Sequence, residues 1–282
     1  VLGPDNQVLG LTPKNTPAIW IKPIAIILGL AVFSALAIGM LYIDAKVVSY
    51  LTYLLGGAAI FIFVMVMADK TLNKFEKNRV IVLFTVVFFV IFFWSAFEQA
   101  GASLTFFAEE QTQRDLGFYT VPASWFQSLN SIFVVAFAPL FAWLWIKLGK
   151  HEPSAPTKMA IGLFLLAVGY LWIAFGVKNV EPGIKVSMMW LLGMYALHTW
   201  GELCLSPIGL SLVNKLAPLK FASLLMAVWF LANAAANKFA GVLSALYPDG
   251  KTTSFLGYEM NDNYDFFMLF VGMAGLASLI LF

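Results

Sequence analysis

Three polar residues recur at four-residue intervals inside a long apolar run of this chain. His198, Glu202 and Ser206 would share one face of a helix, because residues four apart lie above one another. An acid deep in a membrane costs roughly 3 kcal/mol even on insertion scales, so it usually has a partner and a function. A carboxylate beside an imidazole could exchange protons or bind an amine. Two simpler interpretations stay open: a hydrogen bond that only packs helices for Glu202, and a satisfied interior histidine for His198.

A second acid, Glu98, lies in another apolar run and shares a helix face with Ser95 and Gln99. Two acids on two membrane-spanning helices indicate ion-coupled movement of a polar solute. The alternative for Glu98 is a fixed ion pair with a basic residue elsewhere.

Two further apolar segments carry polar or aromatic residues that could line a site. Asn130, which shares a face with Gln127, can both donate and accept hydrogen bonds and so suits a peptide-like ligand. Trp229 lies in the middle of its segment and could form a pocket wall or serve ordinary packing. Lys238, nearby in the same segment, could extend toward the membrane edge or pair with a carboxylate. We expect the pair.

Composition assigns the chain to the class of polytopic membrane proteins. Of its 282 residues, 61% are hydrophobic and 11% are charged, whereas soluble domains are about 25% charged. The net charge of +2 does not favour nucleic acid. A single cysteine allows no disulfide within the chain, and paired metal ligands, phosphate-binding glycine loops and nucleophile elbows are lacking. We therefore expect no metal, no cofactor and no enzymatic activity, and an ion gradient rather than ATP as the source of energy.

A membrane span needs about 20 mainly apolar residues, and eight segments qualify or nearly do. These are Pro23–Ile43, Val47–Met67, Val80–Phe107, Pro122–Leu148, Met159–Val177, Val186–Leu212, Phe221–Leu246 and Phe266–Phe282. The short link at residues 44–46 predicts a tight hairpin between the first two. Pro207 is expected to kink or interrupt its span, and interrupted helices often line transporter sites. The acidic links Ala108–Val121 and Tyr247–Asp265 are expected to be solvated loops.

Loop charges predict the orientation of the chain. If the N-terminal loop is cytoplasmic, most lysines and arginines fall in cytoplasmic segments, as the positive-inside rule requires. The chain begins without an initiator methionine and stops inside an apolar run, so we expect it to be part of a larger protein.

Four stretches together resemble the proton-coupled oligopeptide transporter family of the major facilitator superfamily. They are Phe93–Leu104 (FWSAFEQAGASL), Phe126–Asn130 (FQSLN), Gly201–Ser211 (GELCLSPIGLS) and Trp229–Asn233 (WFLAN). The first and third are the most specific, and their order and spacing agree over nearly the whole chain.

The resemblance implies an all-α integral membrane fold, namely the six-helix C-terminal bundle of a bacterial transporter preceded by a two-helix transmembrane hairpin. It divides the chain into a cytoplasmic central loop (1–22), the accessory hairpin (23–69) and core helices seven to twelve (70–282). The inner membrane, with the N-terminal loop in the cytoplasm, is the expected location. The N-terminal six-helix bundle, which in this family holds further acids, an arginine and a lysine, would be a missing partner beside membrane lipid.

Family roles carry over by motif position. Glu98 matches an acid of proton coupling and gating, and Glu202 matches an acid of proton coupling that receives the amino terminus of a peptide together with Asn130. Ser206 falls near the same pocket, and Trp229 matches an aromatic residue of its wall. No role carries over for His198 or Lys238. The implied function is proton-driven symport of di- and tripeptides. Two alternatives remain: the same fold carrying another small solute such as nitrate, or a helical membrane subunit that does not transport.

Overall fold

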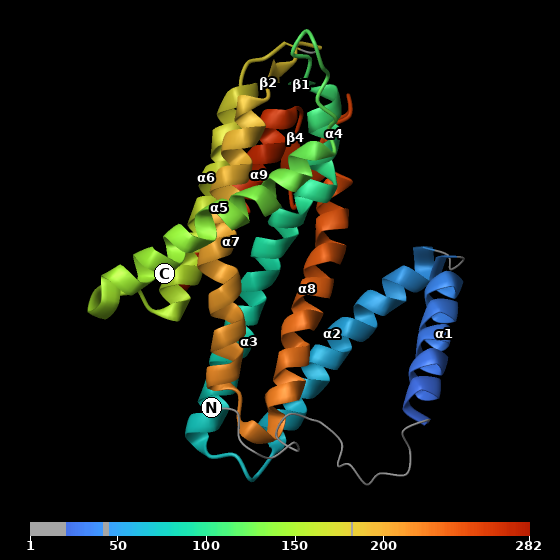
Figure 1. Cartoon of the computed structure of the whole chain (residues 1–282), viewed down its shortest axis with the longest axis vertical. Helices are drawn as coiled ribbons and strands as arrows, with labels where there is room; N and C mark the ends of the chain where they lie inside the picture. Colours follow the sequence, from blue (N-terminus) through green and yellow to red (C-terminus); the bar gives the residue numbers. More distant parts are fainter. Residues whose placement is uncertain (1–20, 42–44, 182) are drawn as a thin grey trace. The chain divides into compact units, whose positions relative to one another are not determined.

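A computed structural model describes residues 21–41, 45–181 and 183–282 and shows an almost entirely helical chain (Figure 1). The α-helices are α1 (Ile21–Leu41), α2 (Ala45–Ala68), α3 (Lys74–Phe97), α4 (Ser103–Glu110), α5 (Trp125–Leu148), α6 (Ala155–Val177), α7 (Met189–Leu216), α8 (Ala222–Ser244) and α9 (Asn263–Leu281). Short 3-10 helices are η1 (Glu98–Gly101), η2 (Gly149–His151) and η3 (Leu219–Phe221). The strands are β1 (Thr112–Gln113), β2 (Val186–Ser187), β3 (Thr253–Phe255) and β4 (Tyr258–Met260).

Contacts within the chain define two units, residues 1–53 and 54–282, each of which we describe by itself. In the first unit, α1 exposes apolar side chains such as Ile27, Leu30 and Phe33. A helix that is apolar all round is typical of a membrane span. Residues 1–20 and 42–44 are outside the described part of the chain, so most of the expected N-terminal loop and part of the predicted tight turn are not seen.

The class of all-helical membrane protein is confirmed. Five described helical segments are long and apolar enough to cross a membrane, namely Lys74–Glu110, Trp125–His151, Ala155–Val177, Leu219–Ser244 and Asn263–Leu281. Each predicted span coincides with a described helix to within a few residues, except that α3, η1 and α4 together make up the third one. Helix α7, which carries His198 and Glu202, is long enough to span but less apolar than these five.

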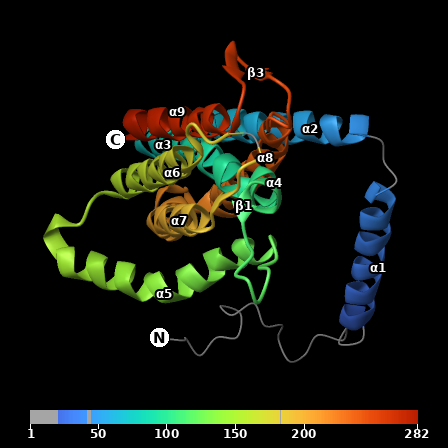
Figure 2. The ribbon, with the colours of Figure 1, turned by 90° about the horizontal axis from the view of Figure 1, so that it is seen from above.

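The second unit is held together by helices that pack pairwise. Helix α6 packs against both α7 and α9, α3 packs against α8, and α5 packs against α7 along one side of the group (Figure 2). Between them lie fully buried aromatic rings, including Phe93, Phe107, Tyr170, Phe267 and Phe270. Helix α5 differs from the others because Phe126 is its only buried residue. The core therefore lies between α3, α6, α7, α8 and α9, and α5 exposes most of its surface.

Two glycines bring α6 and α7 into close contact. A Cβ atom added to Gly162 would lie 2.7 Å from the carbonyl oxygen of Gly201, and one added to Gly201 would lie equally close to the carbonyl oxygen of Gly162. Small residues allow helices to approach in this way in membranes, where van der Waals packing supplies much of the association energy. The backbone of α7 is thus fixed against α6 at the residue before Glu202.

The interruption of a spanning helix occurs at a different place from the predicted one. Helix α7 continues through Pro207, so this proline does not interrupt the helix, and the predicted kink stays a prediction. The Val80–Phe107 segment, predicted as continuous, instead breaks into α3, η1 and α4, with Ala102 in a non-helical conformation (φ −132°, ψ −107°). Proline is tolerated within a membrane helix when neighbouring groups satisfy the freed backbone. The break at η1 includes Gly101, and glycine disfavours a helix more than any residue except proline.

The links at one end of the second unit contain more structure than the expected loops (Figure 1). Strand β1 pairs in parallel with β2, Thr112 lying opposite Val186. Strands β3 and β4 form a hairpin whose two turn residues, Leu256 and Gly257, both have positive φ. Such turns match the right-handed twist of the strands and favour glycine. The two links predicted as solvated loops are therefore partly ordered by short strands.

Candidate functional site

Helices α5 and α7 bring Asn130 and Glu202 together in the interior of the second unit. The side-chain nitrogen Nδ2 of Asn130 donates a hydrogen bond of 2.8 Å to Oε2 of Glu202. Both residues are partly buried. The other carboxylate oxygen, Oε1, accepts no hydrogen bond within the described residues. The geometry therefore leaves one oxygen of Glu202 available to accept a hydrogen bond from an outside donor, such as an ammonium group, or to bind a proton.

Thr199, a buried residue that was not among the predicted site residues, supports this pair. Nδ2 of Asn130 also contacts Oγ1 of Thr199 at 3.2 Å, and that hydroxyl donates to the carbonyl oxygen of Tyr195 at 2.7 Å. Thr199 thus uses its proton on its own helix, and its oxygen remains an acceptor for the amide. The arrangement fixes which way the Asn130 amide points. Thr199 stands three residues before Glu202, a spacing that could have identified it as a neighbour on the same face.

Glu98 occupies the break between α3 and α4. It ends α3 and begins η1, and its side chain is partly buried. Helices α3 and α7, at whose end and within which the two acids lie, pack against each other. The structure therefore brings together the two acids that the sequence singled out, on different helices, as charges of the same sign.

No cation neutralises either acid in the described part of the chain. The ion pairs found there join Lys158 to Glu152 and Lys220 to Asp69. Lys238, for which we expected a carboxylate partner, forms no ion pair among these residues and is partly buried. The expected pair is therefore not seen within the described residues, and it stays a prediction. A fixed ion pair for Glu98, which was the alternative interpretation, is likewise not seen in the described ranges.

Ser206 and Trp229 lie further along α7 and on α8. Ser206 is partly buried one turn beyond Glu202, and its hydroxyl makes no hydrogen bond within the described ranges. Trp229 is buried, and its ring lies over Gly209 of α7, where an added Cβ would come within 2.0 Å of the ring. The indole therefore packs α8 onto α7 in this structure, which is the simpler of the two interpretations of Trp229.

His198 faces different neighbours from Glu202, although four residues separate them. Its ring is buried beside Gly169 of α6, near the rings of Phe97 and Tyr170. Its Nε2 atom has no hydrogen-bond partner among the described residues. The polar stripe predicted for α7 is thus divided: Glu202 and Thr199 meet α5, whereas His198 packs against α6 and α3. This packing favours an interior histidine over proton exchange with Glu202.

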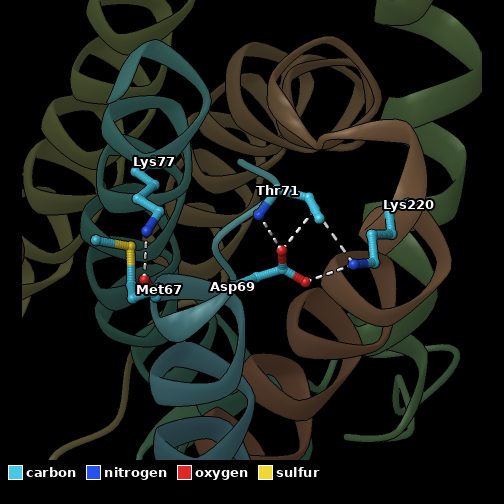
Figure 3. Close-up of polar contacts among 5 residues, drawn as sticks. All are labelled: Met67, Asp69, Thr71, Lys77 and Lys220. Carbon is cyan, nitrogen blue, oxygen red and sulfur yellow. Dashed lines mark hydrogen bonds and ion pairs between the residues drawn. The ribbon is translucent and has the colours of Figure 1, made fainter. Parts of the chain in front are cut away.

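A further acid forms an ion pair at the end of the unit where α2 meets α3 (Figure 3). Oδ2 of Asp69 accepts from Nζ of Lys220 at 2.5 Å, and Oδ1 accepts from the backbone and hydroxyl of Thr71. These bonds, with the Lys220 bond foremost, hold the pKa of the Asp69 carboxyl well below its usual range. Nearby, Nζ of Lys77 donates to the carbonyl oxygen of Met67. No local pattern predicts this pair, because 151 residues separate its members.

The fold and the site define a helical membrane protein that holds two acids without a cation inside its described bundle. Comparison with known families matches residues 43–261 to the POT family, PTR2. The chain belongs to the POT family, a family of transporters and not of enzymes.

Curated relatives agree with this assignment. The chain is 36% identical over 258 residues to the uncharacterized transporter YclF of Bacillus subtilis, covering 88% of this chain and 52% of that protein. It is 35% identical to the peptide transporter YePEPT of Yersinia enterocolitica, covering 70% of this chain and 39% of that protein. It is 30% identical to dipeptide and tripeptide permease A of Escherichia coli, covering 65% and 37%. The chain thus spans about half the length, or less, of these relatives.

Solved structures give the same result. A crystal structure of a peptide transporter POT in complex with sulfate superposes with a TM-score of 0.75 at 32% identity, covering 94% of this chain and 53% of that one. A POT family transporter in complex with 5-aminolevulinic acid gives a TM-score of 0.73 at 27% identity, covering 95% and 54%. The chain is therefore a multi-pass membrane protein whose fold matches about half of such a transporter.

Proposed function

We propose that this chain forms the C-terminal half of a transporter that moves di- and tripeptides together with protons across the bacterial inner membrane. In this assignment residues 23–69 are an accessory transmembrane hairpin and 70–282 contain core helices seven to twelve. The loop 1–22 would lie in the cytoplasm. The missing half would contribute the other wall of the pathway.

The hydrogen bond between Asn130 and Glu202 is the observation that carries this function. A carboxyl group that accepts from a neutral amide is not neutralised by a fixed cation, and its second oxygen is left without a hydrogen bond in the described residues. The ammonium group at the start of a peptide has the charge and the donors to fit that oxygen. Asn130 would keep Oε2 in place and offer its own carbonyl oxygen to a peptide N–H group. Ser206, one turn away on α7, and Trp229, on α8 with its ring over Gly209, would complete this end of the pocket.

Glu98 would serve as the proton carrier in the same cycle. It lies at the break that ends α3, a helix that packs against the α7 helix of Glu202, and it has no cation partner in the described residues. Two like charges repel, so a proton on Glu98 would favour a charged Glu202 and the binding of an ammonium group. Loss of the proton from Glu98 would restore the repulsion and weaken binding of the ammonium group. Loss of the ammonium group would make a charged Glu202 less favourable. Alternating access would then come from rocking of the two bundles around this central site.

The largely exposed surface of α5 supports a missing partner. Within α5 only Phe126 is buried, although the helix carries Asn130 of the candidate site. An apolar cavity of about 370 Å³ lies beside α5 and the start of α7, lined by residues that include Trp125, Leu129 and Leu192. A second bundle would cover such a surface, and lipid would cover the remainder.

Uptake by the whole transporter tests the proposal. The protein would be reconstituted into liposomes with an inward proton gradient and supplied with a labelled dipeptide. Glu202→Gln keeps the size of the side chain and removes its charge, so driven uptake should fall about a hundredfold or more, as expected when a buried charge partner is lost. Asn130→Leu should raise the concentration of peptide for half-maximal uptake about tenfold, because Oε2 loses its buried donor.

Glu259→Gln is the matched control, since Glu259 is an exposed acid in the β3–β4 hairpin. It should transport as the unmodified protein does. Normal uptake by Glu202→Gln would contradict the site. Gradient-driven accumulation of nitrate in place of the dipeptide would contradict the substrate, and absence of any driven uptake by the unmodified protein would contradict symport.

A further inference from the structure

The break between α3 and α4 leaves backbone groups without their helical partners inside the bundle. Glu98–Gly101 forms a 3-10 turn, and Ala102 leaves the helical conformation altogether. In a membrane each unsatisfied backbone group costs several kcal/mol, so such breaks persist only where other groups satisfy them. Two side chains do so here: the hydroxyl of Tyr170 donates to the carbonyl oxygen of Ala96 at 2.6 Å, and that of Thr105 donates to Ala100 at 2.9 Å.

Gln99 makes the most extensive set of bonds at this break. Its Nε2 atom donates to the carbonyl oxygen of Ala240 in α8 at 2.9 Å and to that of Ser95 in α3 at 3.2 Å. Its Oε1 atom accepts from the hydroxyl of Ser103, the first residue of α4, at 2.6 Å. Gln99 and Ser103 are both fully buried. One side chain therefore joins the helix before the break, the helix after it and the neighbouring helix.

Only an amide can make this set of bonds. Two donated bonds and one accepted bond require both an NH₂ group and an oxygen, and a carboxylate would lack the donors. Because successive residues of a 3-10 helix point about 120° apart, fixing the side chain of Gln99 also fixes the direction of its neighbour Glu98. Gln99 points into the contact with α8, and Glu98 is consequently turned away from that contact.

We infer that Gln99 is a positioning residue, whose bonds to α3, α4 and α8 hold the break open so that Glu98 faces the transport pathway. This inference rests on the proposed function, in which Glu98 takes up the coupling proton. It adds a requirement that the acid alone does not meet. An uncharged side chain, that of Gln99, must keep the carboxylate of Glu98 in place while its charge changes; we call this side chain and its three hydrogen bonds the brace.

The test compares Gln99→Met with Gln113→Met in the whole transporter. Methionine has nearly the length of glutamine but makes none of the three bonds, and Gln113 is exposed in β1. Gln99→Met should lower proton-driven dipeptide uptake about tenfold and shift its dependence on pH, because buried hydrogen bonds are lost. Exchange of labelled for unlabelled dipeptide, without a gradient, should stay within about threefold of normal. Gln113→Met should change neither.

Amide hydrogen exchange separates the brace from the transport function. In Gln99→Met the amides of residues 99–105 should exchange about tenfold faster than in the unmodified protein, in keeping with opening of a locally stabilised segment. If the unmodified protein moves no peptide, the proposed function fails, and faster exchange in Gln99→Met would still support the brace. Unchanged exchange and an unchanged pH profile would overturn the inference.

Ser103→Ala covers the case in which Gln99→Met does not fold. It removes only the bond onto Oε1 of Gln99, so the shift in the pH profile should have the same direction and a smaller size. A pH profile identical to that of the unmodified transporter would overturn the role of Gln99. If Ser103→Ala reduced dipeptide exchange without a gradient as much as it reduced driven uptake, the role would also be overturned. The variant would then impair transport in general and not proton coupling.

Discussion

Asp69 and Glu202 are both hydrogen-bonded carboxylates, but their partners differ in charge. Asp69 lies at an end of the second unit and pairs with Lys220 at 2.5 Å (Figure 3). Glu202 lies within the helices and accepts from the neutral amide of Asn130. An acid paired with a lysine is held in its ionised form, whereas an acid held by an amide can be neutralised by a proton or a bound ammonium group. Asp69 therefore serves to join two segments of the chain, whereas Glu202 can change its charge.

Glu98 provides the largest test of this comparison. Glu98→Gln removes the charge while keeping the shape of the side chain at the break. We expect dipeptide accumulation against a gradient to be lost, a change of about a hundredfold, because the proton no longer has an acceptor. Exchange of dipeptide at equal pH on both sides should continue. Proton flux measured together with uptake in liposomes checks this.

The matched control for Glu98 is Asp69→Asn, which neutralises an acid of the other kind. It should leave accumulation within about twofold of normal, as expected for a surface ion pair. If Glu98→Gln and Asp69→Asn lost dipeptide accumulation equally, the difference between interior and terminal acids would have no bearing on transport.

Gly201→Ala tests whether the backbone under Glu202 is fixed. The new Cβ would meet the carbonyl oxygen of Gly162 at 2.7 Å, and a backbone atom cannot move aside as a flexible side chain can. Overpacking of this kind usually costs about 1–3 kcal/mol, so the melting temperature should fall by several degrees and dipeptide affinity should weaken. Gly241→Ala is the control, since an added Cβ there meets no atom within 4 Å. A stable Gly201→Ala protein with normal affinity would show that α6 and α7 can separate without effect.

The smallest expected effect is the dependence of the Asp69 pair on pH. The folded protein lowers the pKa of Asp69, with Lys220 as the main cause. Its contribution to stability is therefore present above the unfolded pKa, about 4, and is lost as pH falls toward the lower folded value. The melting temperature of the unmodified protein should slightly exceed that of Asp69→Asn near pH 7, and the difference should shrink below about pH 4. A difference that grows in acid would contradict the pair.

The sequence predicted the helices and the two interior acids well, because both depend on local composition. A run of about 20 apolar residues identifies a span, and an acid within it is conspicuous, as Glu98 and Glu202 were. The pairing of Asn130 with Glu202 followed from the family resemblance alone, since no local pattern relates residues 72 apart.

Features that depend on packing between distant segments were missed or misplaced. The break at Glu98–Gly101 is hidden because apolar residues continue on both sides of it, so the whole segment has the length of a single span. Pro207, in contrast, drew attention to a helix that in fact continues. His198 and Glu202 share a spacing of four, but which helix meets each is decided by the glycine contacts of α6. The Gln99 and Lys220 contacts span 141 and 151 residues. Periodicity along one helix carries no information about such partners.

The glycine contact between α6 and α7 limits how the carboxylate of Glu202 can move. The main chain of α7 is held against α6 one residue before Glu202, where Gly201 contacts Gly162. Whatever reach the carboxylate has must then come from rotation about its own side-chain bonds, over a few ångströms, while the helix beneath it stays still. If the carboxylate has to move further with a bound ligand, α6 and α7 must move together as one rigid pair.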